Sequence, residues 1–169
     1  MKIYLASDHA GFQLKQELIP FIKNLDFRHE VEDLGPLKFD ENDDYPDFMA
    51  PLAKKIQAEP AARGIIIGGS GEGEAMTANR FKGVRAAVFY GEHTPIQYVD
   101  MTSRPSKDPY EIVKLARLHN DANILSIGAR FATSAESKMA VQLFLETKFT
   151  NEERHVRRIK KIDSLTPES

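Results

Sequence analysis

Residues 65–83 read IIIGGSGEGEAMTANRFKG, and this stretch indicates how the chain folds. Three β-branched residues, which favour a buried strand, lead directly into a run of glycines, and a helical pattern follows. Glycine-rich turns between a strand and a helix usually bind phosphate, because their N–H groups and the helix N-terminus attract anions. This turn instead carries two carboxylates, Glu72 and Glu74, whose presence has to be explained.

Short apolar runs alternate with amphipathic stretches along the rest of the chain. The apolar runs predict strands at 2–7, 29–35, 64–69, 84–90 and 123–128. Helical spacing and capping residues predict helices at 11–25, 43–57, 74–81, 108–120, 134–149 and 151–163. Because strand–helix–strand units cross over in a right-handed sense, the alternation predicts an α/β fold, three-layer α/β/α and Rossmann-like, with a parallel sheet of about five strands.

Proline and aspartate mark the expected helix boundaries. Asp44 is a candidate N-cap with Pro46 in the first turn, and Asp108 is a candidate N-cap followed by Pro109. Pro20 falls inside the first predicted helix, where we expect a kink or a restart of the helix.

We expect one main domain with an appended helix. Residues 1–150 are expected to form a single α/β domain, and residues 91–108 are interpreted as an inserted loop, since they lack periodicity and contain two prolines. Residues 151–169 are expected to form a basic C-terminal helix and tail that pack on the domain or on a dimer partner. Residues 164–169, at the end of that tail, are expected to be frayed.

The composition argues against several classes of function. The 169 residues include 23 Lys and Arg against 25 Asp and Glu, and this net charge of −2 favours neither nucleic acid nor an anionic membrane as a partner. The sequence has no cysteine, which excludes disulfides, thiolate metal sites and a cysteine nucleophile. No apolar run approaches a signal peptide or the ~20 residues of a membrane span, so we expect a soluble cytoplasmic protein.

Potential ligand-binding groups gather at one edge of the predicted sheet. In open parallel sheets, ligands bind outside the carboxyl ends of the strands. Asp8 and His9 follow the first predicted strand, the glycine-rich turn follows the third, and Arg130 follows the fifth. A polar pair such as Asp8 and His9 in this position indicates a binding crevice.

The glycine-rich turn fits neither common nucleotide-binding pattern. It lacks the Gly-Lys-Ser/Thr of a Walker loop and the spacing of the dinucleotide fingerprint. Gly69, Gly71 and Gly73 would let successive N–H groups turn inward as an anion-binding nest. The alternative, a tight turn whose glutamates only favour the positive end of a helix, stays open for Glu74.

Two further groups allow a functional or a structural interpretation. His119 ends a helix, where it either takes part in chemistry or only interacts with the helix dipole. Arg154 and Arg158, four residues apart, either grip one anion together or lie in solvent. An apolar stripe on the same helix is expected to pack down: Val156, Ile159 and Ile162. No histidine or carboxylate spacing typical of a metal site occurs, so no metal is expected.

Seven short motifs together resemble one family. They are SDHAG (7–11), DDYP (43–46), GGSGEGE (68–74), ANRFKGVRAA (78–87), HNDANIL (119–125), GAR (128–130) and RHVRRI (154–159). In order and approximate spacing they resemble the ribose-5-phosphate isomerase type B family, which includes the galactose-6-phosphate isomerase subunits. The resemblance covers nearly the whole chain except residues 91–108.

The resemblance implies an activity and an assembly. It implies that a sugar phosphate is the ligand and that the reaction interconverts aldose and ketose phosphates, chiefly ribose 5-phosphate and ribulose 5-phosphate. It implies neither a metal nor an organic cofactor. It also implies a homodimer, or a dimer of such dimers, whose active sites are shared between two subunits.

The resemblance further implies roles for individual residues. Many family members have a catalytic cysteine where this chain has Gly68, but the chain resembles a subgroup whose GGSGxGE motif ends in a glutamate base. The implied catalytic residues are Glu74 as base, Ser70 for proton movement at the substrate oxygens, and His119 with Asp8 for ring opening. The implied phosphate contacts are His9, Arg130, Arg154 and Arg158. The implied contacts to the sugar and the enediolate, with the pocket lining, are Tyr45, Gly69, Gly71, Glu72, Gly73 and Asn120.

Elementary chemistry supports the role of the glutamate base. One carboxylate close to two neighbouring carbons can move a proton between them, and fixed N–H donors stabilise the enediolate oxygen. We expect the helix dipole and the nest to keep Glu74 ionised. The side chain of Glu72 is expected to point to solvent or to a polar partner.

Two other functions stay open. The chain could isomerise a hexose or tetrose phosphate, because the length of a pocket is not visible in a sequence. It could also be a non-catalytic module that binds a sugar phosphate or a nucleotide, although a binder needs no base such as Glu74. The loop of residues 91–108 is expected to begin beside the site, where it would reshape the pocket, cover it or enlarge a subunit contact.

Overall fold

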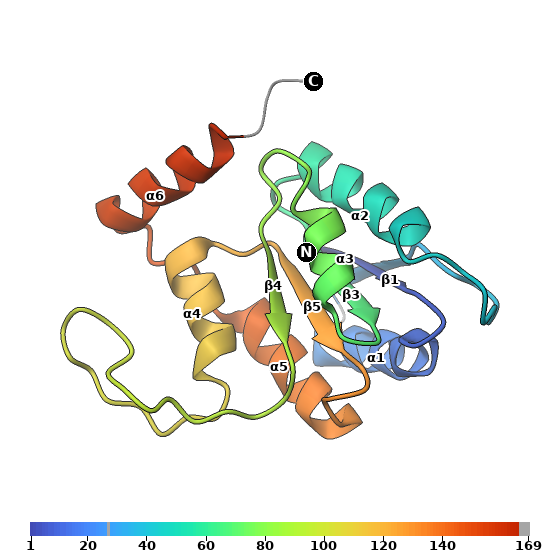
Figure 1. Cartoon of the computed structure of the whole chain (residues 1–169), viewed down its shortest axis with the longest axis horizontal. Helices are drawn as coiled ribbons and strands as arrows, with labels where there is room; N and C mark the ends of the chain where they lie inside the picture. Colours follow the sequence, from blue (N-terminus) through green and yellow to red (C-terminus); the bar gives the residue numbers. More distant parts are fainter. Residues whose placement is uncertain (27, 166–169) are drawn as a thin grey trace.

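The chain forms one parallel sheet. The computed structural model describes residues 1–26 and 28–165. The strands are β1 Lys2–Ser7, β2 Glu30–Asp33, β3 Arg63–Gly68, β4 Ala86–Phe89 and β5 Ile124–Gly128. They lie in the order β2-β1-β3-β5-β4, and each neighbouring pair is parallel. The carboxyl ends of these strands therefore share one edge of the sheet, at the bottom of Figure 1.

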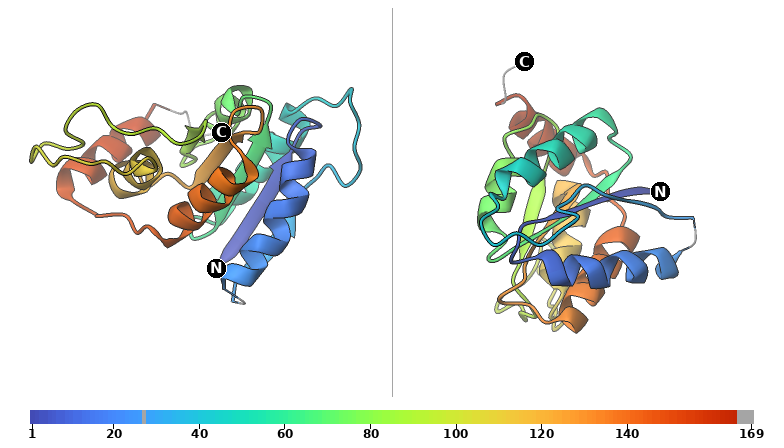
Figure 2. Two further views of the ribbon diagram at one scale, coloured as in Figure 1. Left: turned by 90° about the horizontal axis from the view of Figure 1, so that it is seen from below. Right: turned by 90° about the vertical axis from the view of Figure 1, so that its right-hand side faces the viewer.

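Helices cover both faces of the sheet. They are α1 Phe12–Leu25, α2 Pro46–Ala58, α3 Glu72–Ala78, α4 Glu111–Asn120, α5 Ser134–Glu146 and α6 Glu153–Asp163. Helices α1, α4 and α5 pack on one face and α2 and α3 on the other, whereas α6 lies outside these layers at the end of α4 (Figures 1 and 2). The expected three-layer α/β/α fold is confirmed. None of the helices in the described part of the chain has the length and apolar character needed to cross a bilayer.

The central strand β3 carries side chains into both layers of the core. Successive side chains of a strand point to opposite faces of its sheet. Ile65 and Ile67 belong to the core under α1 and α5, whereas Ile66 belongs to the core under α2 and α3, and all three are fully buried. Burial on both faces explains why this strand reads as an unbroken apolar run.

The two aspartates that we expected to cap helices do not do so. Helix α2 starts at Pro46 after Tyr45, whose backbone is already helical at φ −51° and ψ −35°, so Asp44 stands one residue too early. Asp108 instead accepts the backbone N–H of Tyr110 at 2.9 Å, and this turn delays the start of α4. Asp44 and Asp108 therefore belong to the turns that precede these helices.

Helix α6 packs on the rest of the chain through one side only. Its His155 is buried, with 3% of its surface exposed. The apolar stripe does not pack down as expected, because Val156 and Ile159 are only half-buried and Ile162 is 47% exposed. This face of α6 is therefore partly exposed. Residues 166–169 of the expected frayed tail lie outside the described residues.

The turn after β1 depends on a close approach to β3. A Cβ built on Gly11 would lie 2.3 Å from the carbonyl oxygen of Ile67, and the backbone N–H of Asp8 donates to the same oxygen at 3.2 Å. We predict that Gly11→Ala lowers the free energy of unfolding by about 1–3 kcal/mol, because the two backbone segments must move apart. Urea unfolding measures the change. Gln16→Ala, on the exposed side of α1, should leave the midpoint unchanged, and an unchanged midpoint for Gly11→Ala as well would contradict the contact.

Candidate active site

The carboxylate of Glu74 fills the space beside Gly68, at the carboxyl end of β3. Glu74 lies in the first turn of α3 and is only 3% exposed. A Cβ built on Gly68 would lie 1.8 Å from the Oε1 atom of Glu74, so this arrangement requires glycine at position 68. The other oxygen, Oε2, is buried and has no hydrogen-bond partner among the described residues. That oxygen therefore keeps an unused capacity to accept a hydrogen bond or a proton.

Burial raises the pKa of Glu74. The neighbouring carboxyl group of Asp8 raises it further, through charge repulsion and a side-chain hydrogen bond, whereas the backbone N–H groups of Glu74 and Gly71 lower it. We expected the helix end and the nest to keep Glu74 ionised. The backbone donors do act in that direction, but burial and Asp8 outweigh them. A raised pKa makes the ionised carboxylate a stronger base.

Gly71 gives the turn between β3 and α3 its shape. It stands at the N-cap of α3 with φ +79°, a left-handed conformation in which other residues are strained. Its carbonyl oxygen accepts a hydrogen bond at 2.5 Å from the hydroxyl of Ser126, which is fully buried in β5. The turn is thus fixed to the neighbouring strand.

Two large side chains lie directly over the other glycines of the turn. A Cβ built on Gly69 would lie 3.3 Å from Cζ of Arg130, and the backbone N–H of Arg130 donates to the carbonyl oxygen of Gly69 at 3.1 Å. A Cβ built on Gly73 would lie 2.7 Å from Cζ of the Tyr45 ring. The missing side chains at Gly69 and Gly73 therefore allow a cation and an aromatic ring to border the turn.

His9 forms a hydrogen-bonded pair with Asp43 beside this turn. Its Nδ1 lies 2.7 Å from Oδ1 of Asp43, which also accepts the backbone N–H of His9 at 3.0 Å. The bond to Asp43 raises the pKa of His9, and the charge of Asp8 acts in the same direction, while burial and Arg130 oppose them. A protonated His9 next to Arg130 suits a dianionic group such as phosphate.

The two glutamates of the turn occupy different environments. The side chain of Glu72 is exposed, as expected, and its backbone N–H donates to Oγ of Ser70 at 3.2 Å. Ser70 is half-buried at the start of the turn. Of the two carboxylates, only that of Glu74 is buried against the ends of β1 and β3.

A second group of expected site residues lies at the C-terminal end of α4. The ring of His119 stacks on that of His155 from α6, with centroids 4.3 Å apart and planes inclined by 11°. Nε of Arg154 donates to Nε2 of His155 at 3.2 Å. Burial lowers the pKa of His155, and the neighbouring His119 and Arg154 lower it further. A neutral His155 can accept this hydrogen bond and support both neighbours.

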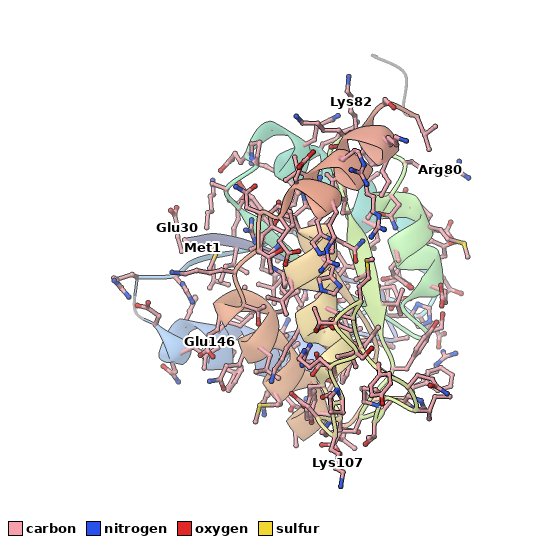
Figure 3. The ribbon with its side chains drawn as sticks, turned by 90° about the vertical axis from the view of Figure 1, so that its left-hand side faces the viewer. Met1, Glu30, Arg80, Lys82, Lys107 and Glu146 are labelled. Carbon is pink, nitrogen blue, oxygen red and sulfur yellow. The ribbon has the colours of Figure 1, made fainter. Side chains whose placement is uncertain are left out.

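A cavity of about 260 Å³ borders this second group. His119, Arg154 and Arg158 line it together with residues 98–101 of the loop. Figure 3 views this side of the molecule, with α6 above α4 and Lys107 of the loop at the bottom. Asn120 is exposed and lines a different cavity, of about 320 Å³.

The structure divides the expected site residues between two edges of the sheet. The carboxyl edge holds Asp8, His9, Tyr45, Gly69, Ser70, Gly71, Glu72, Gly73, Glu74 and Arg130. The group of His119, Asn120, Arg154 and Arg158 lies toward the amino edge, because α4 ends only a few residues before β5 begins. In Figure 1 the turn after β3 is at the bottom of the sheet and α6 is at the top.

The loop of residues 91–108 begins at the carboxyl edge of the sheet, beside the site, as expected. It leaves β4, which β5 separates from the central strand β3. A Cβ built on Gly91 would lie 3.4 Å from the carbonyl oxygen of Phe131, the residue after Arg130. Figure 2 shows the loop extending from the side of the molecule where α4 lies. Its tip reaches the second group, because residues 98–101 and His119 line the same cavity.

Two residues of the site were not singled out in the sequence. Asp43 belongs to the DDYP motif, but the partner that gives it a role, His9, is 34 positions away. His155 directly follows Arg154 in a basic stretch, and its stacking on His119 joins two separate helices. A carboxylate two residues before a tyrosine and a histidine among arginines are the signals that could have drawn attention to them.

Comparisons with known proteins identify the family. The sequence model of one family, described as Ribose/Galactose Isomerase, matches residues 3–100 and 107–162. The chain belongs to the Ribose/Galactose Isomerase family. Ribose-5-phosphate isomerase B of Mycobacterium tuberculosis is 38% identical over 159 residues, which cover 94% of this chain and 86% of the relative.

Solved structures of family members share the fold. Ribose-5-phosphate isomerase B from Mycoplasma genitalium, solved with bound ribulose 5-phosphate, is 37% identical, with a TM-score of 0.82 over 97% of this chain and 95% of its own. The type B enzyme from Trypanosoma cruzi is 31% identical, with a TM-score of 0.82 over 98% of this chain and 97% of its own. The likeness therefore extends over nearly the whole length of each chain.

The pair formed by His9 and Asp43 leads to a prediction. Asp43→Asn keeps an oxygen acceptor but removes the charge, so the pKa of His9 should fall from its raised value toward or below that of free histidine. The pair stabilises the fold while His9 is protonated, and this contribution is lost as the pH rises through the raised pKa. Titration of the His9 ring protons by NMR measures the shift.

Asp44→Asn is the matched control, since Asp44 is the exposed neighbour of Asp43. It should leave the pKa of His9 where it is in the unsubstituted protein. Equal His9 pKa values in the unsubstituted protein and in Asp43→Asn would show that the pair does not exist in solution.

Proposed function

We propose that this chain interconverts ribose 5-phosphate and ribulose 5-phosphate by proton transfer through an enediolate, with no metal or organic cofactor taking part. The observation that carries the proposal is the carboxylate of Glu74, which is buried, has a raised pKa and keeps one oxygen without a partner among the described residues. Membership of the family supports the same reaction, and relatives that are similar over nearly their whole length are named for it.

Glu74 acts as the base in both halves of the reaction. It takes the proton from C2 of the open-chain aldose, and the electrons of that bond form the enediolate while the C1 carbonyl becomes an oxyanion. The same proton returns to C1, and C2 becomes the carbonyl as its hydroxyl proton passes to O1. The hydroxyl of Ser70 assists this movement between the two oxygens. Backbone N–H donors of the Gly69–Gly73 turn stabilise the oxyanion, an effect that typically contributes several kcal/mol. The N–H groups of Gly71 and Glu72 take part only by leaving their present partners, the Glu74 carboxylate and Ser70 Oγ.

The remaining residues hold and prepare the substrate. His119, with Asp8, opens the sugar ring so that the carbonyl at C1 is available. The phosphate is bound by cationic side chains from both groups: His9, Arg130, Arg154 and Arg158. The raised pKa of His9 supports this role, because the protonated ring and the guanidinium groups carry charge opposite to that of the phosphate. Tyr45 and Asn120 contact the sugar.

We infer that two protomers build each active site. Within one protomer, Glu74 follows β3 at the carboxyl edge, whereas His119 ends α4 toward the amino edge, so the two do not reach a single small sugar phosphate together. His119, Arg154 and Arg158 of one protomer would complete the site at Glu74 of its partner, and a two-fold axis makes the two sites equivalent. The open apolar stripe of α6 supports such a contact, since its exposed Ile162 gains burial there.

The same proposal assigns roles to the parts of the chain. Residues 1–150 supply the base, the oxyanion donors and the fold, and the helix within residues 151–169 supplies the arginines. A cytoplasmic location is part of the proposal, because charged sugar phosphates do not cross membranes unaided.

Two alternative functions are an isomerase of a hexose or tetrose phosphate and a non-catalytic module that binds a sugar phosphate or a nucleotide. The buried carboxylate of Glu74 argues against the second alternative, because a binding module needs no base.

Substitution of the proposed base tests the function. We predict that Glu74→Gln lowers kcat for ribose 5-phosphate by roughly a hundredfold or more, because the amide cannot accept the proton, while the affinity for the substrate is retained. A coupled isomerase assay measures kcat, and exchange of the C2 proton with solvent reports the first step alone. The same assay across pentose, hexose and tetrose phosphates determines which sugar phosphate is preferred.

Glu72→Gln is the control, because it makes the same change two residues away on an exposed side chain. It should retain nearly full activity. If Glu74→Gln and Glu72→Gln are equally active, Glu74 is not the base. If the unsubstituted protein isomerises none of these sugar phosphates, the proposed function is wrong.

A further inference from the structure

The tip of the loop formed by residues 91–108 is an organised turn. The backbone N–H of Val99 donates to the carbonyl oxygen of Arg104 at 3.0 Å and closes the turn. Inside it, Oδ1 of Asp100 accepts the backbone N–H of Thr102 at 2.9 Å and its hydroxyl at 2.6 Å. These bonds hold the tip in one conformation.

Charged side chains attach this turn to the start of α4. Arg104 donates to Oε1 of Glu111 at 2.6 Å and to Oδ2 of Asp100 at 3.0 Å, and Ser106 donates to Oε2 of Glu111 at 2.7 Å. Glu111 is only 4% exposed. Burial alone would raise the pKa of Glu111, but the bonds from Arg104 and Ser106 outweigh it and keep the pKa below its usual value. Glu111 is therefore ionised at neutral pH, and the attachment persists there.

The same turn departs from the pattern of the family. The family's sequence model matches residues 3–100 and 107–162 and leaves residues 101–106 unmatched. The unmatched segment includes Arg104, which anchors the turn, and Met101, which borders the cavity of the second group. The part of the turn that carries Met101 and Arg104 therefore lies outside the family's sequence model.

Two apolar side chains of the turn stand beside the cationic groups of the cavity. Tyr98 and Met101 are 65% and 76% exposed, and both line the cavity together with His119, Arg154 and Arg158. An aromatic ring and a thioether next to two guanidinium groups suit a ligand with an anionic end and a carbon chain. The arginines hold the anion, and the apolar side chains contact the carbon chain, whose C–H groups they shield from water.

We propose that Tyr98 and Met101 form a wall of the substrate pocket and set the length of the sugar phosphate that Arg154 and Arg158 accept. This inference rests on the proposed function, because it assigns the cavity of about 260 Å³ to the phosphate end of that substrate. The attachment through Arg104 keeps the wall in place, so a longer sugar phosphate collides with it. Discrimination between pentose and hexose phosphates then depends on the turn.

The test widens the pocket in one variant and narrows it in another. Tyr98→Ala combined with Met101→Ala removes the wall, and Met101→Trp enlarges it. In the double variant, kcat/KM for ribose 5-phosphate divided by kcat/KM for a hexose 6-phosphate should fall by roughly tenfold. One additional carbon in a substrate typically changes discrimination by a pocket by about tenfold or more. The ratio should rise in Met101→Trp. Calorimetry with ribose 5-phosphate itself measures binding apart from turnover.

Ile96→Ala is the matched control, because Ile96 is an apolar residue of the same loop that is 89% exposed and lies outside the cavity of His119. It should leave both the ratio and the affinity unchanged. Size-exclusion chromatography establishes that each variant keeps the oligomeric state of the unsubstituted protein. The proposed wall is wrong if, in all variants, the kcat/KM ratio and the affinity for ribose 5-phosphate stay within about twofold of those of Ile96→Ala.

The two readouts separate the wall from the reaction. If the unsubstituted protein turns over no sugar phosphate, yet the double variant binds ribose 5-phosphate more weakly than Ile96→Ala does, the wall is supported and the isomerase function is wrong. If turnover is normal and substitution of Tyr98 and Met101 changes neither the binding nor the kcat/KM ratio, the function is supported and the wall is wrong.

Discussion

The carboxylate of Glu74 occupies the space that any side chain at position 68 would need. The rest of the site depends on this close contact. Glycine at 68 lets the carboxylate turn back against the end of β3, where it is buried beside Asp8. Burial and the neighbouring charge then raise its pKa, which gives the site a base of greater strength. The two glutamates therefore do not conflict with the glycine-rich turn. Glu74 is buried within the site, and Glu72 is exposed to solvent.

The fold could be predicted from the sequence because the pattern of β3 and its neighbours leaves one solution. Unbroken apolar runs between amphipathic helices require a parallel sheet covered on both faces. The exact starts of α2 and α4 could not be predicted, because the turns that contain Asp44 and Asp108 delay both helices.

For the candidate site, the residues at the carboxyl edge could be predicted because they follow the ends of the strands. The pairing of His9 with Asp43 and the stacking of His119 on His155 depend on contacts between distant segments.

The division of the site between two edges connects the chemistry to the assembly. The proposed base and oxyanion donors lie at the carboxyl edge, whereas His119, Arg154 and Arg158 lie at the corner between α4 and α6. Under the proposed function, each half of the site is completed by the other half from a partner protomer. The turn of residues 98–104 lies at the same corner, so the proposed wall of Tyr98 and Met101 would contact the substrate from the side of the arginines.

Subunit complementation tests the shared site most directly. Glu74→Gln and His119→Ala are each expected to be inactive as homodimers, because every site lacks one group. When the two variants are co-expressed, each mixed dimer carries both substitutions in one site and none in the other. The account predicts that activity returns, up to about a quarter of the wild-type value for random pairing of protomers. Mixed dimers as inactive as their parents would contradict it, because each site would then be built from a single protomer.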